Sequence, residues 1–268
     1  MQSPVNSQTF EAPAGVPRVV GVIPSRWGST RFPGKSLAPI AGVPLVLRVI
    51  RRVRLATTLS DVIVATDDPR IAEVVRADGA TAVLTRPDHP SGTDRIAEAV
   101  RALPVPPDIV VNIQGDEPLI DPALVDAVAQ ALANPAAFDM ATAATPIASA
   151  DELHRPDVVK VVTDDDGAAL YFSRAPIPFV RGAPADFPPV PGRHWRHVGL
   201  YAYTRAALER MVAAPPAPLE QLEKLEQLRA LALGMRIKVI PTNHSGAGVD
   251  SPDDIPRVEA LLREQGIE

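Results

Sequence analysis

The sequence contains no cysteine among its 268 residues, which excludes disulfides, thiolate metal sites and cysteine nucleophiles. It also contains no apolar run of about 18 residues, the length that a membrane-spanning helix requires, so we expect no membrane partner. Basic residues do not outnumber acidic ones, and the net charge of −5 argues against nucleic acid as a partner. The composition is otherwise that of an ordinary globular protein, and the length fits one large α/β domain or two small ones.

Lysine is scarce as well, with only Lys35, Lys160, Lys224 and Lys238 among the 27 basic residues. A genome biased toward arginine codons explains the scarcity, but Lys35 is notable because it lies in a Gly-containing loop. The first seventeen residues have neither a basic start nor an apolar segment, so we expect 1–17 to be a disordered leader rather than a secretory signal. The absence of cysteine is consistent with a cytoplasmic location.

Strand-like and helix-like segments alternate through the first half of the chain. The β-branched run at 18–23 is followed directly by a polar loop at 24–36. Further strands are predicted at 61–65, 80–84 and 108–113, with helices at 44–57, 69–78, 93–102 and 121–133. This alternation predicts βαβ units, and hence an α/β fold with a Rossmann-like, mostly parallel central sheet flanked by helices.

The pattern changes after residue 138, where strand-like runs follow one another without helices between them. We predict strands at 139–145, 158–163, 168–173, 197–203 and 235–240, and helices at 204–213, 218–233 and 253–265. Consecutive strands indicate a smaller mixed or antiparallel subregion. The Asp-Gly at 166–167 predicts a hairpin turn, and the Pro- and Gly-rich segment 181–193 predicts an exposed loop.

The loop at 24–36, PSRWGSTRFPGKS, carries three cations, Arg26, Arg31 and Lys35. Ligands of open α/β sheets bind where loops leave the carboxyl ends of strands, and cations with free backbone N–H groups suit a triphosphate. The loop is not a Walker A motif, because Ser29 occupies the position of the first glycine. A dinucleotide-binding G-x-G-x-x-G is absent, which argues against a dehydrogenase. A plain basic surface loop is the alternative.

The loop resembles the P-A-R-x-x-S-x-R-x-P-G-K signature of sugar nucleotidylyltransferases. More closely, the chain is similar to the 3-deoxy-manno-octulosonate (Kdo) cytidylyltransferase family. The similarity continues in order through VATDD, RPDHPSGTDR, VNIQGDEPLI, VVKVVTDDDGAALYFSRAPIP, RHVGLYAY, PLEQLEKLEQLR and GVDSPDD, between about residues 18 and 265. It implies a single domain over 18–268, with 18–138 mainly nucleotide-binding and 139–250 mainly sugar-binding and dimer-forming.

Three features depart from the family pattern. Ser25 stands in place of the common alanine, and Ser36 in place of the proline usual after the lysine. The leader and the loop at 181–193 have no clear counterpart, so we assign them no function.

Two acidic residues are candidate ligands for Mg²⁺, which prefers oxygen donors and is commonly held by one or two carboxylates together with substrate phosphates. Asp116 follows a predicted buried strand, although it could be a turn residue or a helix N-terminal charge. Asp250 follows the last predicted strand and is the best second ligand, although it could be an N-cap; the resemblance implies the same pair. For Asp68, followed by Pro69, a helix cap is the favoured interpretation.

The resemblance also implies residues for the nucleotide and the sugar. Its catalytic set is Arg26, Lys35, Asp116 and Asp250, and its CTP-binding set is Arg26, Arg31, Lys35, Arg86, Ser91 and Gly92. For a 2-keto sugar acid we expect cations from Arg174 and from the Arg196-His197 pair, with hydroxyls bound by Gln114, Tyr201, Glu223 and Gln227. Glu223 and Gln227 are expected on one face of a single helix, with Leu219, Leu222, Leu225 and Leu228 packing in the core.

The implied reaction is Mg²⁺-dependent transfer of CMP from CTP to Kdo, which releases pyrophosphate and serves lipopolysaccharide synthesis in a Gram-negative bacterium. The implied assembly is a cytoplasmic homodimer. A CMP-sialate synthetase, or a cytidylyltransferase for a related 2-keto sugar acid, is the alternative in the same class. A non-catalytic nucleotide-binding protein is the alternative from another class, and the retention of the charged loop residues with both aspartates argues against it.

Overall fold

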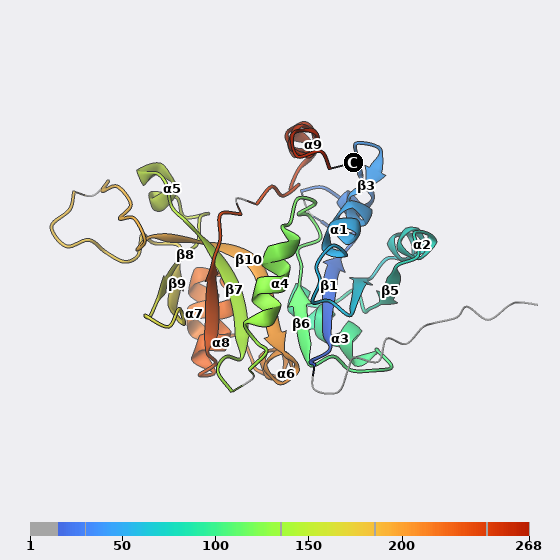
Figure 1. Ribbon diagram of the computed structural model, residues 1–268, viewed down its shortest axis with the longest axis horizontal. Coiled ribbons are helices and arrows are strands. Elements are labelled where there is room, and N and C mark those ends of the chain that lie inside the picture. Colours follow the sequence, from blue (N-terminus) through green and yellow to red (C-terminus); the bar gives the residue numbers. More distant parts are fainter. Residues whose placement is uncertain (1–15, 30, 135, 185, 245, 268) are drawn as a thin grey trace, which may run out of the picture.

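The computed structural model of the chain describes residues 16–267 except 30, 135, 185 and 245. Most of the predicted leader, residues 1–15, therefore lies outside the described residues. The main feature is a nine-stranded sheet (Figure 1). Seven of its strands follow the order β11-β7-β10-β6-β1-β4-β5; of the other two, β8 pairs with β10, and β9 pairs with β8. Its strands are β1 (Val19–Ser25), β4 (Asp61–Thr66), β5 (Thr81–Leu84), β6 (Ile109–Asn112), β7 (Met140–Pro146), β8 (Lys160–Thr163), β9 (Ala169–Ser173), β10 (Trp195–Thr204) and β11 (Ile237–Pro241).

Strand direction divides the sheet as the sequence predicts. Strands β6, β1, β4 and β5 are mutually parallel, whereas β10 runs antiparallel to β6, β7 and β8. The Asp-Gly segment joins the antiparallel strands β8 and β9, with Gly167 at φ 73°, so the predicted hairpin turn is confirmed. A short hairpin of β2 (Pro39–Ile40) and β3 (Val43–Pro44), which the sequence did not reveal, lies apart from the main sheet.

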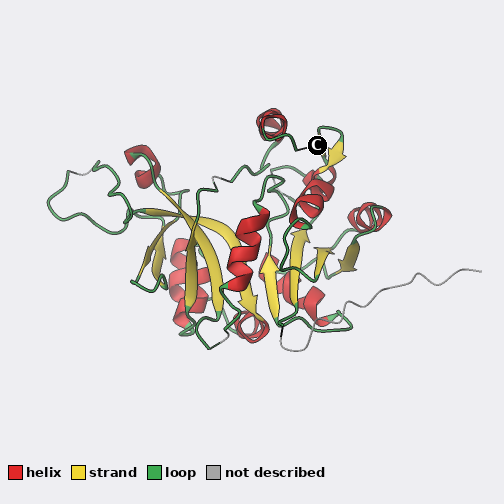
Figure 2. Cartoon of the chain, in the orientation of Figure 1, coloured by secondary structure: helices red, strands yellow, loops and turns green. Residues whose placement is uncertain are grey.

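Helices cover both faces of the sheet (Figure 2). They are α1 (Leu45–Val53), α2 (Pro69–Ala77), α3 (Gly92–Arg101), α4 (Pro122–Gln130), α5 (Ala150–His154), α6 (Arg205–Ala213), α7 (Pro218–Glu223), α8 (Gln227–Ala232) and α9 (Ile255–Glu264), with 3₁₀ turns η1 (Lys35–Leu37) and η2 (Pro252–Asp254). None of the helices in the described part of the chain has the length and apolarity needed to span a bilayer.

Two apolar cores result from the alternation of side chains along the strands. On β1, Val19 and Ile23 pack in the core that contains α1, α2, α4 and α9. Their neighbours Val20 and Val22 pack in the opposite core, with α3, α6 and α8. The predicted architecture, a mostly parallel central sheet flanked by helices with a mixed subregion, is therefore confirmed.

The prediction of one continuous helix over 218–233 is wrong. The chain forms α7 and α8 instead, because Lys224 between them adopts a left-handed conformation with φ 54°. The Glu223 carbonyl, which a continuous helix would use for its own ladder, accepts a hydrogen bond of 2.7 Å from Arg174 Nε. A tertiary contact thus overrides helix propensity at this point. Glu223 and Gln227 consequently do not share one helical face.

Candidate active site

A cavity of about 390 Å³ lies at the edge of the sheet where the parallel strands β1 and β6 end. Crevices at the carboxyl ends of parallel strands are the usual ligand sites of such sheets. The wall comes from the loop after β1, from the segment leading into α3, from the segment after β6 and from Asp250. Its residues are Pro24, Ser25, Arg26, Ser29, Arg31, Lys35, Ser36, His89, Pro90, Ser91, Gly92, Arg95, Gln114, Gly115, Asp116 and Asp250.

Trp27 anchors the loop between β1 and η1. Its backbone N–H donates to Asp67 Oδ1 at 3.2 Å, and the Arg70 guanidinium lies 3.4 Å from the centroid of its ring. Gly34 turns the chain at φ 71°, and a Cβ there would approach the Trp27 ring to 2.9 Å, so the turn requires glycine. These contacts hold the loop against the start of α2, with its cations on the cavity wall.

Arg70 is itself held by Asp68, which accepts from Arg70 N at 2.9 Å and from the Arg70 side chain. This confirms the interpretation of Asp68 as the cap of α2, with Pro69 at the first helical position.

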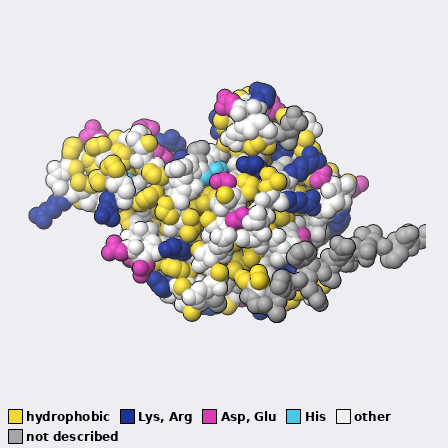
Figure 3. All heavy atoms as spheres, in the orientation of Figure 1, with side chains coloured by type: hydrophobic (Ala, Val, Ile, Leu, Met, Phe, Trp, Pro, Cys, Tyr) yellow, Lys and Arg dark blue, Asp and Glu magenta, His cyan; other side chains and the backbone are white. Residues whose placement is uncertain are grey.

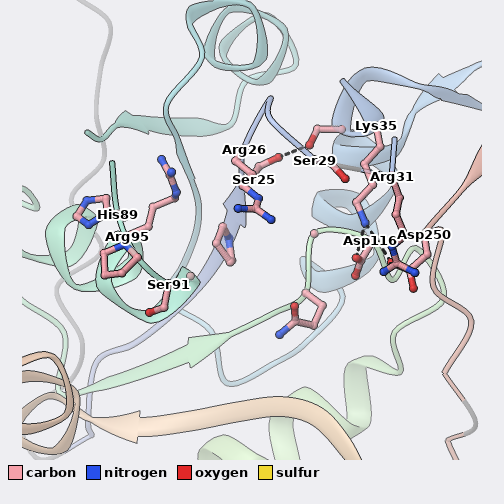
Figure 4. A pocket seen from close by; sticks show the side chains of 16 residues that line it. Ser25, Arg26, Ser29, Arg31, Lys35, His89, Ser91, Arg95, Asp116 and Asp250 are labelled. Carbon is pink, nitrogen blue, oxygen red and sulfur yellow. Dashed lines mark hydrogen bonds and ion pairs between the residues drawn. The ribbon is translucent and has the colours of Figure 1, made fainter. Parts of the chain in front are cut away.

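Asp116 and Asp250 face the same cation, although they are far apart in sequence. The Lys35 ammonium lies 2.6 Å from Asp116 Oδ2 and 3.6 Å from Asp250 Oδ1, and it donates to the Val249 carbonyl at 3.0 Å. Arg31 pairs with Asp250 Oδ1 at 2.9 Å. Figure 4 shows the four charged side chains gathered on one side of the cavity. The sequence prediction that the two carboxylates reach one place is therefore confirmed.

The alternative structural roles of the two aspartates can also be examined. Asp250 is not the N-cap of the closing segment, because Ser251 and Asp254 form the capping box there. Asp116 does lie in a turn, but α4 is capped by Asp121 rather than by Asp116. Gly115 lets this turn cross the end of β1, since a Cβ there would lie 2.9 Å from the Pro24 carbonyl oxygen.

The opposite wall carries Arg95, Ser91 and His89, with Arg26 between the two sides (Figure 4). Ser91 caps α3, because its hydroxyl accepts from Asp94 N at 3.2 Å. Arg95 was missed by the sequence analysis, although it lies in the quoted SGTDR segment. It is a buried cation, held by Thr85 Oγ1 at 2.6 Å and by Asp67 Oδ2 at 3.2 Å. The cavity thus has four cationic side chains, of Arg26, Arg31, Lys35 and Arg95.

Arg86, which the resemblance placed at the nucleotide, is not among the cavity-lining residues. Its side chain is 65% exposed, and its Nε lies 3.6 Å from Glu98 and 3.8 Å from Asp88. The reason is geometric, since Arg86 precedes the turn that brings Ser91 and Gly92 to the cavity.

Of the predicted sugar residues, Gln114 lines the cavity, and the others are not among its lining residues. Gln114 Nε2 donates at 3.0 Å to the carbonyl of Gly199, which lies in the irregular stretch of β10 between His197 and Tyr201. The rings of His197 and Tyr201 are 5.3 Å apart. On the other side Thr93 donates to Glu226 at 2.7 Å, directly before Gln227. Two hydrogen bonds therefore connect the cavity with the segments that carry the predicted sugar residues.

Glu223 binds the strand end rather than pointing freely into solvent. Its carboxylate accepts from the Ser173 hydroxyl at 2.7 Å and from Arg174 N at 2.9 Å. Arg174 in turn donates to the Glu223 carbonyl and to that of Pro156. Gln227, at the start of α8, is buried. The end of β9 and the α7–α8 break are thereby fixed to one another.

The expectation that His197 supplies a positive charge is wrong. Burial lowers the pKa of His197 to about 3, so the ring is neutral near pH 7. Its Nε2 lies 2.9 Å from the Thr142 hydroxyl, so it can take part in hydrogen bonds without a charge. The neighbouring Arg196 pairs with Glu152 at 3.3 Å. Burial also raises the pKa of Glu117 to about 7, and the adjacent negative charge of Asp116 adds to this rise.

The cavity suits a metal ion for which substrate and water supply most of the ligands. Within the described part of the chain, no three His, Cys, Asp or Glu side chains form a metal-binding group. Asp116 and Asp250 nevertheless converge on one cation, the Lys35 ammonium, which shows that one positive charge can be shared by both. Two carboxylates without further protein donors fit Mg²⁺ bound together with phosphates.

Comparison with known proteins shows the family. A family model described as cytidylyltransferase matches residues 20–237. A protein from Burkholderia ambifaria named 3-deoxy-manno-octulosonate cytidylyltransferase 2 is 51% identical, over 91% of this chain and 92% of its own. The chain belongs to the 3-deoxy-manno-octulosonate cytidylyltransferase family. A second member, from Anaeromyxobacter, is 50% identical over 91% of this chain and 97% of its own.

A solved structure supports the same family and fold. It is described as CMP:2-keto-3-deoxy-manno-octonic acid synthetase complexed with CTP. It matches this chain with a TM-score of 0.85 and 40% identity, over 92% of this chain and 99% of the other. Membership of the 3-deoxy-manno-octulosonate cytidylyltransferase family therefore rests on sequence and on structure.

Proposed function

We propose that this chain transfers the cytidylyl group of CTP to Kdo, with release of pyrophosphate. The observation that carries the proposal is the cavity itself, where four cations and two converging carboxylates meet at the sheet edge. That charge pattern suits a triphosphate with a divalent cation, and the solved relative was determined in complex with CTP. Retention of every charged group argues against a non-catalytic binding protein.

The chemistry requires one bond to form and one to break at the α-phosphorus. The anomeric oxygen of the sugar attacks the α-phosphorus, and the bridging oxygen to the β-phosphorus leaves with pyrophosphate. The chain contributes position and charge rather than a covalent intermediate. Arg26, Arg31 and Lys35 bind phosphate oxygens, and Ser91 with Gly92 lies where small groups can approach the base. The proton of the attacking hydroxyl is lost to a base that we do not assign.

Asp116 and Asp250 are proposed to hold a Mg²⁺ ion, which would supply charge neutralisation at the phosphates. In the structure Lys35 and Arg31 neutralise these carboxylates. Phosphate oxygens would attract the same two cations and leave both carboxylates free for the metal.

The sugar is proposed to bind beyond Gln114, along β10 and the α7–α8 break. Gln114, Tyr201, Glu223 and Gln227 offer hydrogen-bonding groups for hydroxyls. Arg174 offers the cation for the sugar carboxylate, and neutral His197 offers a ring nitrogen.

We also propose a homodimer that acts in the cytoplasm and supplies lipopolysaccharide synthesis in a Gram-negative bacterium. Leu170 is 62% exposed and Phe179 is 75% exposed. Figure 3 shows hydrophobic side chains gathered over α5 and the loop that extends beyond β8 and β9. Exposed apolar surface of this kind is typical of subunit contacts. Light scattering at micromolar concentration should give the mass of two chains, and a monomer would contradict the dimer.

The deciding experiment is a pyrophosphate-release assay with each of the four ribonucleoside triphosphates, against Kdo and against N-acetylneuraminate. We expect turnover only with CTP and Kdo, abolished by excess EDTA and restored by added Mg²⁺. Equal turnover with N-acetylneuraminate would favour a sialate synthetase. Binding of CTP without turnover of either sugar would favour a non-catalytic protein.

A further inference from the structure

Two serines lie at the two ends of the loop that lines the cavity. Ser25 is the last residue of β1, and Ser36 lies in η1, directly after Lys35. Their side-chain oxygens are 2.7 Å apart, a hydrogen-bond distance, and both residues line the cavity. They are 3% and 4% exposed. These are also the two positions at which the loop departs from the alanine and proline of the family pattern.

The pair holds one more hydroxyl proton than its internal hydrogen bond uses. Each serine hydroxyl has one proton and two acceptor lone pairs. The contact between the two oxygens uses one of the two hydroxyl protons. In the described part of the chain neither side-chain oxygen has another hydrogen-bond partner. One hydroxyl proton of the pair is therefore left without an acceptor among the residues that the structure describes, at the wall of the cavity.

The surroundings indicate what kind of acceptor that proton meets. The cavity is lined by four cations, Arg26, Arg31, Lys35 and Arg95, against the two carboxylates of Asp116 and Asp250, and this excess of positive charge favours an anionic ligand. A hydroxyl that already accepts one hydrogen bond is a better donor for a second, because hydrogen bonds in a chain polarise one another. Hydrogen bonds to a charged acceptor are also the stronger ones.

We propose that Ser36 donates a hydrogen bond to a phosphate oxygen of the bound nucleotide, and that Ser25 positions Ser36 by donating to it. Ser36 is thus a binding residue, and Ser25 acts through it. The inference rests on the proposed use of CTP. An alanine and a proline at these two places cannot supply this donor.

The test compares ligands with and without phosphates on Ser36→Ala, Ser25→Ala and the double variant. Calorimetric titration would measure the Kd of CTP, of inorganic tripolyphosphate and of cytidine. Ser36→Ala should weaken CTP and tripolyphosphate by the same factor, about tenfold or more, and leave cytidine unchanged. Ser25→Ala should give a smaller loss, and the double variant should resemble Ser36→Ala, because the two serines act as a unit.

Ser149→Ala is the matched control, since Ser149 caps α5 away from the cavity and accepts from Glu152 N at 3.1 Å. It should lower the melting temperature without changing any Kd. If Ser36→Ala lowers the melting temperature but leaves the Kd of CTP unchanged, the serine pair only stabilises the fold and the proposal fails. An equal loss for cytidine would also overturn it. Failure of the wild-type protein to bind CTP would instead refute the proposed function.

Discussion

Asp250 and Asp254 are four residues apart, yet the structure gives them different tasks. Asp250 pairs with Arg31 at 2.9 Å, and its side chain is 53% exposed. Asp254 accepts hydrogen bonds from Asp250 N at 3.0 Å, from Ser251 N at 2.9 Å and from the Ser251 hydroxyl at 3.0 Å. We therefore expect Asp250→Asn to impair turnover and Asp254→Asn to impair stability.

The hydrogen bonds from Ser251 N and Asp250 N lower the pKa of Asp254 from an ordinary 3.8 to about 2. That difference corresponds to about 2.4 kcal/mol, which partial exposure reduces to about 1–2 kcal/mol. Because the folded pKa is depressed, this stabilisation is present above about pH 4 and is lost as the pH falls toward 2. Asp250→Asn removes an exposed ion pair, which contributes at most about 1 kcal/mol.

The effects on turnover should be reversed. Removing one of the two carboxylates proposed to hold Mg²⁺ should lower kcat by about 100-fold or more, the usual cost of losing one electrostatic partner of a transition state. Asp254→Asn should leave kcat nearly unchanged, because Asp254 does not line the cavity.

The assay measures pyrophosphate release and urea unfolding on the same samples, with unfolding repeated at pH 7 and pH 3. Asp254→Asn should also lose the acid-dependent part of the stability. If Asp250→Asn proves less stable but turns over normally, Asp250 is a structural residue, and Asp116 remains the only protein carboxylate at the metal.

Three further predictions concern individual charges. Lys35→Ala should raise the KM for CTP by about tenfold or more, since a lost charge-assisted contact costs about 1.5–3 kcal/mol. The control Lys238→Ala, on β11, should leave the kinetics unchanged. Equal effects of the two substitutions would mean that the loop at 24–36 is wrongly assigned to the nucleotide. Because burial lowers the pKa of His197 to about 3, this histidine should lower the stability of the wild-type protein by about 1–2 kcal/mol between pH 7 and pH 5, as the unfolded histidine takes up a proton, whereas the raised pKa of Glu117 acts in the opposite direction. In urea titrations the difference in stability between His197→Gln and wild type should therefore shift by that amount in favour of His197→Gln as the pH falls from 7 to 5, and the same pH dependence in both proteins would point to another group. Arg86→Ala should leave the KM for CTP unchanged, because its side chain is 65% exposed outside the cavity; a raised KM would return Arg86 to the nucleotide.

The sequence predicted best those features that depend on local pattern. The Asp121-Pro122 pair marks the start of α4 because its cap and its proline act within a few residues. The loop cations and Asp116 were found because the segments that carry them follow the buried strands β1 and β6, and the ends of parallel strands share one edge of the sheet. Asp250 was chosen because it follows the last predicted strand, and the resemblance implied the same pair.

The errors came where distant segments decide the outcome. The break after α7 depends on Arg174, which no reading of 218–233 could include. It also explains why Leu219 and Leu222 are 47% and 80% exposed, although they were expected in the core. The neutral state of His197 could not be predicted from the sequence, because the burial that lowers its pKa depends on strands that pair only in the folded sheet. Arg95 was overlooked because its cavity-facing position follows from the turn before α3.

The position of β10 has a consequence for how the chain is made. This strand, Trp195–Thr204, lies between β7 and β6 in the sheet, yet it is synthesised long after β6, Ile109–Asn112. At about 5–20 residues per second, several seconds pass on the ribosome during which β6 has a partner on one side only. All four residues of β6 are buried in the finished sheet, so the nascent chain carries an apolar open edge that can pair with other chains. A fragment that ends before Trp195 should therefore aggregate rather than yield a small, independent nucleotide-binding unit.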